Sequence, residues 1–369
     1  MKKITIIIGT MIQGGAHRIP CIQANELAKH GYDVTLLLVV DSPNRPFQLN
    51  SSVKIEYCFP YENLEGSSFI SKCRRRFLAP FYIKKALKKI TPDIVISHVQ
   101  GTNRESILAC KSMGVRVIVC EHTSIHMPYG VMGWFAYLER RFIYKLSDAI
   151  TVLTEYDYNK FYKKYHDNVI VLPNPTSFIS RYEIKQELRG KTIVAIGDLN
   201  RIYVKGWDLL IPIFSEVSKS NADWRLKIAG DGIEGKIILK DLAKKYGVAS
   251  KVDFLGSVQN IESLLQESSI FILTSRNEGM PMALLEAMSQ GCACIAFNCK
   301  TGPADLLIHS ANGVLIEDGN CREMSRYLSI LVNDINMRSS LGMQAFESSK
   351  SYTIGNHVHK LMALISKLT

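Results

Sequence analysis

The sequence predicts an α/β protein of two similar halves, each built around a parallel sheet, with a cleft between them. At 369 residues the chain is too long for one typical hydrophobic core. Short, continuous apolar runs alternate with helical segments, which is typical of parallel strands that are covered on both faces. The alternation stops at a polar stretch near the middle of the chain and then begins again, which indicates a second domain.

The first half contains apolar runs of strand length and ends at a proline-bounded segment. The predicted strands are Ile4–Ile8, Val34–Val40, Ile94–Ser97, Val115–Cys120 and Ala149–Leu153. A helix from about Ile19 to His30 is expected to end at Gly31, a residue suited to a helix C-cap. Prolines bracket Asn174, and the polar residues 176–191 are predicted to be a linker. The first domain is therefore expected to span residues 1–175.

The second half repeats the pattern and defines a domain over residues 192–348. Its predicted strands are Thr192–Ile196, Trp224–Ala229, Val252–Leu255, Ile270–Thr274, Cys294–Phe297 and a short turn and strand at 312–316. The helices predicted between these strands are Trp207–Ser218, Lys236–Tyr246 and Ile261–Gln266. Helices are expected to fill the rest of the chain, including a C-terminal segment at 349–369.

Composition and cysteine usage favour a cytoplasmic protein. No apolar run of about twenty residues is present, so no membrane-spanning helix is expected. The N-terminus superficially resembles a signal peptide, but its apolar run is too short and lacks a cleavage site of small residues. The nine cysteines form no Cys-x-x-Cys pair and no spacing with histidine that suggests zinc. We therefore expect reduced, mostly buried thiols.

Positive charge is concentrated in the first half. Residues 1–180 carry 23 Lys and Arg against 14 Asp and Glu, whereas the remainder is close to neutral. The excess peaks in the segment 72–90, at Lys72, Arg74, Arg75, Arg76, Lys84, Lys85, Lys88 and Lys89. Aromatic residues alternate with these charges, which suits either an interfacial helix on anionic lipid or a solvated helix face. No nucleic-acid-binding motif accompanies the charge, so nucleic acid is not favoured as a partner.

Two loops follow predicted strands at the sheet edge where ligands of parallel α/β proteins bind. The glycine-bearing loop Gln13–Ala16 lacks the spacing of the dinucleotide fingerprint and of a P-loop, which disfavours a dehydrogenase. Its glycines, Gly14 and Gly15, either allow close backbone approach to a ligand or form a plain turn. The second loop is Glu121-His122-Thr123, after the fourth predicted strand, and its His122 either faces the cleft or is structural.

The stretch from Ser275 to Asp305 carries two glutamates, Glu278 and Glu286, around the start of a predicted helix. Pro281 favours a helix start because it lacks only an N–H that would be unpaired there. Glu278 should lie in the preceding loop and Glu286 inside the helix. The N–H groups and the positive dipole end of such a helix can bind polar or anionic groups. The alternative is an ordinary helix with two structural glutamates.

Several motifs in this half resemble a known family. They are Lys205–Leu210, Ile228–Gly232, Val252–Gly256, Ser275–Met288 and Asn312–Ile316, with weaker patches at Gly14-Gly15, Glu121-His122 and Val171–Pro175. Together they resemble family 4 retaining glycosyltransferases, which have the two-domain GT-B fold with two Rossmann-like domains. Glu278 and Glu286 correspond to the Glu-x7-Glu signature of that family. In relatives the C-terminal helix crosses back to the first domain, so the same is expected of residues 349–369.

The resemblance implies a role for each matching residue. Glu286 would bind the ribose of a nucleotide sugar, and Glu278 would bind hydroxyls of the donor sugar. Lys205 would pair with the diphosphate and stabilise the leaving group. Backbone groups near Gly279, Met280, Pro281 and Met282 would contact the sugar and the diphosphate. From the first domain, Gly14 and Gly15 would approach the donor, and His122 would reach the sugar ring.

The remaining implied contacts include two departures from the family pattern. The base would lie near Gly230, Gly256 and Val258, and Asn277 and Met280 would tune which sugar fits. Where the family usually has an arginine after the first strand of this domain, the chain has Asp198, and Arg201 is expected to supply the missing positive charge. Asp305 stands where many relatives have a glutamate.

The resulting expectation is a retaining glycosyltransferase that needs neither a metal ion nor a cofactor. It would transfer a hexose or N-acetylhexosamine from a nucleotide sugar, UDP being preferred, to a lipid-linked glycan in bacterial envelope polysaccharide synthesis. The segment 72–90 would then contact the inner face of the cell membrane. Two alternatives remain open: a nucleotide-sugar epimerase, for which no clear set of extra catalytic acids is present, and a non-catalytic nucleotide-sugar-binding subunit.

Overall fold

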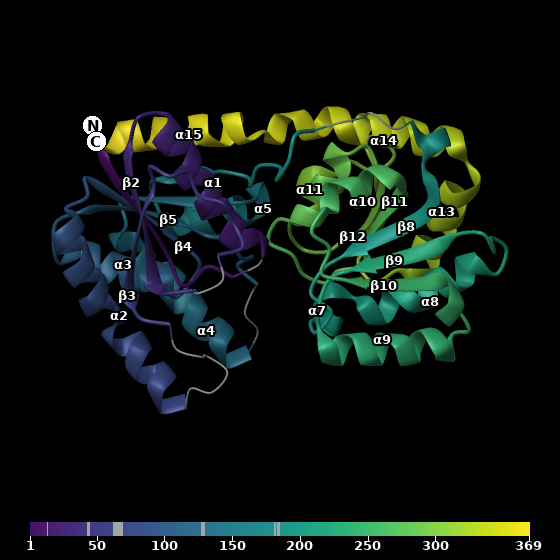
Figure 1. The fold of residues 1–369 in the computed structure, drawn as a ribbon, viewed down its shortest axis with the longest axis horizontal. Coiled ribbons are helices and arrows are strands. Elements are labelled where there is room, and N and C mark those ends of the chain that lie inside the picture. The colour runs from purple at the N-terminus through teal and green to yellow at the C-terminus, as the bar shows by residue number, and fades with distance from the viewer. Residues whose placement is uncertain (13, 43–44, 62–68, 127–129, 181, 183–184) are drawn as a thin grey trace. The chain divides into compact units, whose positions relative to one another are not determined.

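The computed structural model describes residues 1–12, 14–42, 45–61, 69–126, 130–180, 182 and 185–369. For residues 16, 69–76 and 130–132 it describes the backbone alone. Contacts divide the chain into two compact units: unit 1 comprises Met1–Pro175 and Ile354–Thr369, and unit 2 comprises Thr176–Thr353. Both units are α/β units with a parallel sheet, as the sequence predicts (Figure 1).

Unit 1 contains a seven-stranded parallel sheet in the order β3-β2-β1-β4-β5-β6-β7. Its strands are β1 (Lys3–Ile8), β2 (Asp33–Val40), β3 (Lys54–Phe59), β4 (Ile94–His98), β5 (Arg116–Cys120), β6 (Ala149–Val152) and β7 (Val169–Val171). Side-chain alternation in the central strand supplies both cores, because Ile6 packs into one buried cluster and Ile7 into the cluster on the opposite face. This two-sided burial explains why the strands are continuous apolar runs.

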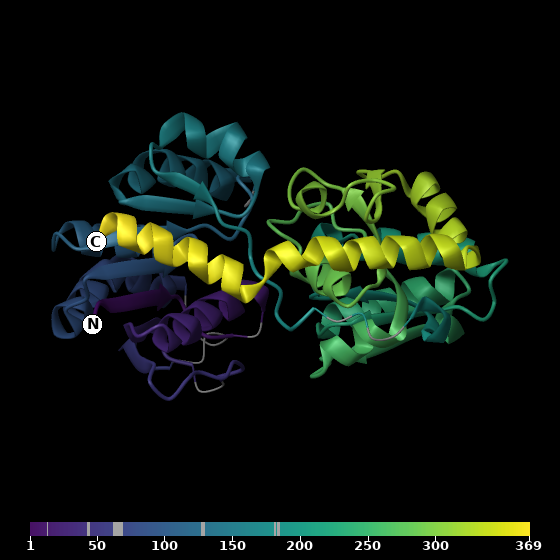
Figure 2. The same cartoon turned by 90° about the horizontal axis from the view of Figure 1, so that it is seen from above.

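Helices cover both faces of this sheet. One face packs against α1 (Gly15–Lys29) and the C-terminal α15 (Ile354–Leu368), which lie side by side (Figure 2). The other face packs against α2 (Phe69–Ile90), α3 (Thr102–Lys111) and the turns that follow α4 (Gly130–Leu138). These turns are η1 (Glu139–Ile143), η2 (Tyr144–Leu146) and, after the short α5 (Glu155–Asp157), η3 (Tyr158–Tyr162) and α6 (Lys163–Tyr165). Leu361, Leu364 and Ile365 bury α15 in the core of unit 1, so the last helix belongs to the first sheet.

Three elements of unit 1 differ from the sequence-based expectation. Strand β7 is not among the predicted strands; it is three residues long and only partly buried at the sheet edge. Helix α1 begins at Gly15, earlier than predicted, because the N–H groups of His17 and Arg18 already donate to the carbonyl of Gly14. Strand β3 is not predicted by the apolar-run criterion. It lies at the sheet edge, pairs only with β2 and is only partly buried, so it carries the polar residues Lys54 and Glu56.

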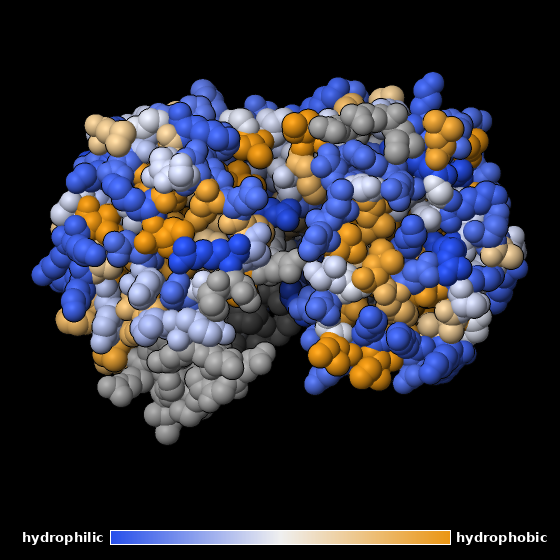
Figure 3. Space-filling view, in the orientation of Figure 1, coloured by the Kyte–Doolittle hydropathy of each residue, from blue (hydrophilic) through white to orange (hydrophobic). Residues whose placement is uncertain are grey.

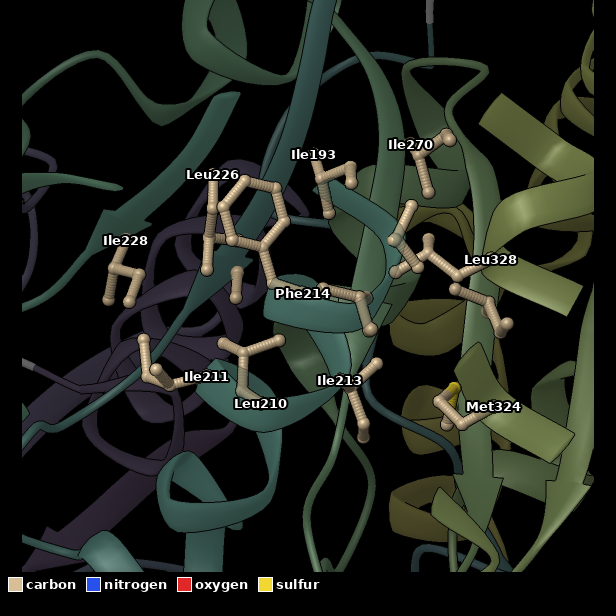
Figure 4. Close-up of a cluster of buried hydrophobic side chains, with 14 of the residues drawn as sticks. Ile193, Leu210, Ile211, Ile213, Phe214, Leu226, Ile228, Ile270, Met324 and Leu328 are labelled. Atoms are coloured by element: carbon tan, nitrogen blue, oxygen red, sulfur yellow. The ribbon is translucent and has the colours of Figure 1, made fainter. Parts of the chain in front are cut away.

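Unit 2 contains a six-stranded parallel sheet in the order β10-β9-β8-β11-β12-β13. The strands are β8 (Gly190–Ile196), β9 (Arg225–Ala229), β10 (Val252–Gly256), β11 (Ser268–Leu273), β12 (Ala293–Asn298) and β13 (Val314–Glu317). The helices are α7 (Ile202–Lys205), α8 (Trp207–Ser218), α9 (Ile233–Lys245), α10 (Ile261–Glu267), α11 (Met282–Ser289), α12 (Pro303–Leu306), α13 (Cys321–Asn333) and α14 (Ile335–Ser349). Figure 4 shows Phe214 of α8 and Leu328 of α13 packed in the main core of this unit.

The described part of the predicted linker, residues 176–191, does not behave as a free connection. The side-chain amide of Gln186 donates to the carbonyl of Gly291 at 3.1 Å, and the guanidinium of Arg189 donates to that of Gln290 at 2.6 Å. Arg189 is buried, and it also donates to the carbonyls of Leu265 and Ser268. A charged residue occurs in this segment because the single guanidinium of Arg189 donates hydrogen bonds to several buried carbonyl oxygens. Residues 185–191 are therefore an integral part of unit 2.

The surface of both units is mainly hydrophilic in the view of Figure 3, with apolar residues gathered in separate patches. Within the described residues, no helix is long and apolar enough to cross a bilayer.

Candidate functional site

The signature glutamates flank the start of α11 as the sequence predicts. Glu278 lies in the loop after β11, and Glu286 lies within α11, where its side chain is buried. Pro281 is the residue just before the helix, with φ −74° and ψ 95°, rather than a member of its first turn. Asn277 and Met280 in the same loop are also buried, whereas Gly279 and Met282 are half-buried. The loop therefore directs its polar groups and a helix N-terminus to one place.

Lys205 meets Glu278 directly. The Lys205 Nζ atom lies 2.8 Å from Glu278 Oε1, and the hydroxyl of Ser275 donates to the same oxygen at 2.6 Å. Both ionic side chains are mostly buried, with exposed fractions of 18% and 10%. Two residues that the sequence singles out separately thus form one partly desolvated ion pair, whose mutual attraction is less screened by water than that of an exposed pair.

The loop that follows β12 contacts the backbone of Glu278 and of the residues after it. The hydroxyl of Thr301 donates to the backbone carbonyl of Glu278. Gly302 has φ 93°, and a Cβ atom there would lie 2.7 Å from the carbonyl oxygen of Gly279 and from Cδ of Pro281. Only glycine fits this conformation and this close approach. The loop from Glu278 to Pro281 is consequently held against its neighbour.

Lys205 is positioned by the end of β11. The hydroxyl of Thr274 donates to the carbonyls of Lys205 and Gly206, at 3.2 and 3.0 Å. Gly206 has φ 65°, and a Cβ atom there would lie 1.9 Å from the carbonyl oxygen of Thr274. These contacts fix the backbone of Lys205 and Gly206. The Lys205 side chain that reaches Glu278 therefore starts from a well-defined position.

The structure does not join Arg201 to this pair. Arg201 is exposed before α7, and among the described residues no ion pair is recorded for its guanidinium. Asp198, which replaces the usual family arginine, accepts the N–H of Asn200 at 2.9 Å and so shapes the turn. A second cation near the loop is Arg276, but it pairs with Asp208 at 2.7 and 2.8 Å. That Arg201 supplies the second positive charge therefore stays a prediction.

Glycines bring the ends of β8, β9 and β10 close together. A Cβ atom on Gly230 would lie 1.8 Å from the carbonyl oxygen of Gly197, so no other residue fits there. The N–H of Gly230 also donates to the carbonyl of Gly256 at 2.8 Å. Gly256 has open space beside it, and Val258 nearby is half-buried. The residues expected near the base thus lie at the carboxyl ends of adjacent strands, the usual ligand edge of such sheets.

In unit 1, His122 pairs with a histidine that the sequence does not single out. Its Nε2 atom lies 2.8 Å from Nδ1 of His98, at the end of β4, and the two rings stack with centroids 5.1 Å apart. The other ring nitrogens, His98 Nε2 and His122 Nδ1, are buried without a hydrogen-bond partner among the described residues. One ring must donate to the other, so one of the remaining nitrogens is a donor and the other an acceptor. Gly14 and Gly15 of the same unit lie at the start of α1.

A buried ion pair supports the His122 loop. Glu121 accepts from Nε of Arg140 at 3.0 Å, and both side chains are almost completely buried. Thr123 donates to the other oxygen of Glu121, and Tyr144 and Tyr162 donate to the same oxygen as Arg140. Burial alone would raise the pKa of Glu121, but the charge and hydrogen bond of Arg140 and the hydrogen bond from Thr123 outweigh it and hold that pKa below its usual range.

Comparison with known proteins decides the family. Residues 13–177 match the family described as Glycosyltransferase Family 4, and residues 180–348 match the one described as Glycosyl transferases group 1. The chain is a family 4 glycosyltransferase with the GT-B fold. The resemblance that the motifs indicate is therefore confirmed.

Relatives of this glycosyltransferase are similar in sequence over almost the whole chain. An uncharacterized glycosyltransferase of Haemophilus influenzae is 29% identical, with 96% of this chain and 97% of that protein covered. A Campylobacter jejuni protein is 27% identical over 100% and 99%, and is named GalNAc-alpha-(1->4)-GalNAc-alpha-(1->3)-diNAcBac-PP-undecaprenol alpha-1,4-N-acetyl-D-galactosaminyltransferase. Among solved structures, a TarM mutant of S. aureus in complex with UDP, fondaparinux and alpha-GlcNAc-glycerol has a TM-score of 0.79 at 14% identity, with 99% of each chain covered. This last likeness supports the fold.

In each unit of this glycosyltransferase, residues to which the sequence alone assigns no role support the candidate residues. Ser275 and Thr301 orient Glu278, Thr274 orients Lys205, and His98 contacts His122. Thr274 is the last residue of one predicted strand, Ser275 follows it, and His98 follows another predicted strand, so position at a strand's carboxyl end was the available signal. Within the described residues, no three His, Cys, Asp or Glu side chains are grouped so as to hold a metal ion.

The histidines of unit 1 predict acid sensitivity of the fold. Burial lowers the pKa values of His17, His98, His122 and His357, those of His122 and His357 to about 4. In the unfolded chain these groups titrate near 6.5. Between pH 6.5 and 4 the unfolded state therefore binds more protons than the folded state at His122 and His357, and stability falls as pH falls, by on the order of 1 kcal/mol per pH unit for each of these two histidines.

Denaturant unfolding at pH 7, 6 and 5 measures this slope. The variant His122→Asn removes one of these buried histidines and is expected to flatten the dependence of stability on pH. The variant His359→Asn, at an exposed position on α15, is the matched control and should leave the slope unchanged. Equal slopes for the wild type and His122→Asn would contradict the prediction.

Proposed function

We propose that this glycosyltransferase moves a hexose or N-acetylhexosamine from a UDP-sugar to a lipid-linked glycan, with retention of anomeric configuration, in bacterial envelope polysaccharide synthesis. The observation that carries the proposal is the Lys205–Glu278 pair beside the N-terminus of α11. It combines a cation, a carboxylate and helix N–H groups at one point. A diphosphate attached to a polyhydroxylated sugar matches this combination of groups.

In the proposed donor complex the ion pair opens to admit the ligand. The diphosphate takes the ammonium group of Lys205, and the freed Glu278 carboxylate accepts hydrogen bonds from sugar hydroxyls. Glu286, inside α11, binds the ribose. As the glycosidic bond breaks, negative charge grows on the diphosphate, and Lys205 and the helix N-terminus stabilise it more strongly in the transition state than in the ground state.

Retention would follow from attack of the acceptor on the same face from which the diphosphate leaves. We assign no protein nucleophile, and the leaving diphosphate takes the acceptor proton. His122, kept neutral by burial, would orient a sugar hydroxyl through its ring nitrogen rather than supply charge. The protein then acts through positioning and charge stabilisation.

The choice of donor and acceptor is supported by relatives. The S. aureus structure of similar fold contains UDP. The C. jejuni relative is named for a substrate linked through a diphosphate to undecaprenol and for an α-linked product. An α product is what a retaining enzyme makes from an α-linked nucleotide sugar.

We further propose that the reaction needs no metal ion and no cofactor. Lys205, supported by the helix N-terminus and by Arg201, would supply the positive charge that a divalent cation provides in other transferases. Turnover should then be unchanged in excess chelator, and its complete loss would refute this part of the proposal.

A donor panel tests the function. UDP-sugars are expected to raise the melting temperature and GDP-sugars are not. Replacing the ribose ligand in Glu286→Gln should weaken UDP-sugar binding about ten- to a hundredfold, the cost of losing charge-assisted hydrogen bonds. Glu234→Gln, an exposed glutamate in the first turn of α9, is the control. Binding without any sugar transfer to lipid-linked acceptors would favour the non-catalytic subunit, and an altered sugar released as nucleotide sugar would favour the epimerase.

For the acceptor we propose that α2 contacts an anionic membrane. Phe77, Phe81, Lys85 and Lys88 follow one another at helical spacing and are exposed, whereas Ile83 and Leu87 are buried on the opposite side. The side chains of Lys72, Arg74, Arg75 and Arg76 lie outside the described residues. An exposed face of aromatic and basic residues suits a surface of anionic lipid headgroups.

A further inference from the structure

A second exposed aromatic surface lies on α4 and the two turns after it. The segment Gly130–Leu138 contains no charged residue. An uncharged helix is normally buried, yet Trp134 is 60% exposed and Phe135 is 56% exposed. Phe142 of η1 and Leu146 of η2 continue the surface, with exposed fractions of 57% and 44%. We name Trp134, Phe135, Phe142 and Leu146 the α4 surface.

The environment of the α4 surface is basic. The guanidinium of Arg141 lies 5.3 Å from the ring centre of Phe142 and 4.7 Å from that of Tyr165. Lys145 is exposed in the next turn, whereas the acidic Glu139 of this segment is buried. The charged groups of residues 134–146 that reach solvent are thus positive. A large apolar surface edged by cations marks a binding site for a partner that is apolar within and anionic outside.

The α4 surface lies on the same side of the unit 1 sheet as α2. Ile83 of α2 and Tyr144 of η2 pack into one buried cluster on that side, and α3 contacts both α2 and η2. Figure 1 shows α2 and α4 on this common side. Helices α2 and α4 therefore lie on one side of this sheet, as contact with a single flat partner requires.

We propose that the α4 surface inserts into the interface of an anionic membrane, with Trp134 and Phe135 at the level of the acyl-chain boundary and with Arg141 and Lys145 at the headgroups. Trp, Phe and basic residues in this order are the chemistry of an interfacial helix. The inference rests on the proposed lipid-linked acceptor and adds an apolar anchor to the electrostatic contact proposed for α2. Two signals of this kind bind a membrane more firmly than either does alone.

Trp134 provides the test without any label. The chain has three tryptophans, and the other two, Trp207 and Trp224 in unit 2, are each only 3% exposed. Fluorescence changes on adding vesicles therefore report on Trp134. With vesicles of phosphatidylglycerol and phosphatidylcholine, the emission should shift to the blue and should be quenched by lipids brominated on their acyl chains. Vesicles of phosphatidylcholine alone should give a much smaller change.

Variants separate the two contacts. The double variant Phe135→Ser with Phe142→Ser should lower the partition coefficient at least about tenfold, since it removes two exposed aromatic side chains. Tyr57→Ser is the matched control: Tyr57 is an exposed aromatic on β3 whose strand neighbour Cys58 packs on the α2 side. Changing Lys84, Lys85, Lys88 and Lys89 to Gln should weaken binding in a salt-dependent way and retain the blue shift of bound protein.

Each outcome decides the matter. Vesicle binding with unchanged Trp134 emission would overturn the inference and leave the α2 contact and the sugar-transfer activity standing. Self-association that buries Trp134 in the absence of lipid, measured by analytical ultracentrifugation, would assign the surface to a second copy of the chain and also overturn it. A blue shift with glycan alone would assign it to a sugar acceptor, with the same consequence.

Discussion

Replacing Lys205 with Met is expected to lower kcat/KM about a hundred- to a thousandfold. This is the usual cost of removing one group that stabilises charge developing in the transition state. The loss should fall mainly on kcat, because the charge on the leaving diphosphate is larger in the transition state than in the bound donor. Steady-state kinetics with a UDP-sugar, together with donor binding by calorimetry, separates the two effects.

The control for this variant lies in the same unit. Lys191 pairs with Asp223 at the exposed start of β8, so Lys191→Met removes an equal charge away from α11. Its kinetics should match the wild type within about twofold. If Lys205→Met raised KM with kcat unchanged, Lys205 would serve donor binding alone, and its role in leaving-group stabilisation would be wrong.

Replacing Arg140 with Met is expected to lower the free energy of unfolding by about 3–5 kcal/mol at pH 7. Methionine fills a similar volume, but the carboxylate of Glu121 is then left buried without its cation. Arg116→Met, at an exposed position that begins β5, is the control and should change stability by less than about 0.5 kcal/mol. Denaturant unfolding followed by circular dichroism measures both.

The pH dependence identifies the buried charge as the cause. In the wild type the pKa of Glu121 is below its usual range, so its contribution to stability is present at neutral pH and is lost as pH falls below the pKa of the unfolded chain. Without Arg140, burial raises that pKa, and protonation of Glu121 relieves the penalty. The difference between Arg140→Met and the wild type should therefore shrink between pH 7 and pH 5. A difference that is independent of pH would indicate a packing defect instead.

Local sequence patterns sufficed for most elements and for the signature loop. The central strands of both sheets are buried on two faces, so they stand out as apolar runs, and Glu278, Pro281 and Glu286 lie within one short segment. The edge strand β3 escaped prediction because its exposed side chains carry no apolar run. Apolar runs in a sequence indicate buried strands, so a strand that is only partly buried is not predicted from them.

Contacts between residues far apart in the sequence could not be predicted from local sequence patterns. The Lys205–Glu278 pair joins residues 73 positions apart, and His98 lies 24 positions from His122. The exposure of Trp134 could not be predicted either, because a helix without charged residues is expected to be buried unless its neighbours in the fold are known. Arg189 shows the reverse error, since a cation in a polar stretch looks solvated and is buried among carbonyl oxygens.

The contact between Lys205 and Glu278 bears on how the enzyme would tell an intact donor from its spent product. Under the proposed roles, a UDP molecule without sugar would compete for the ammonium group but bring no hydroxyls to the displaced carboxylate, which would then face the phosphates with like charge. An intact UDP-sugar would compensate both partners at once. Under the proposed roles, the ion pair re-forms once the sugar has left and helps to expel UDP, so product inhibition should be weaker than the shared diphosphate contacts suggest.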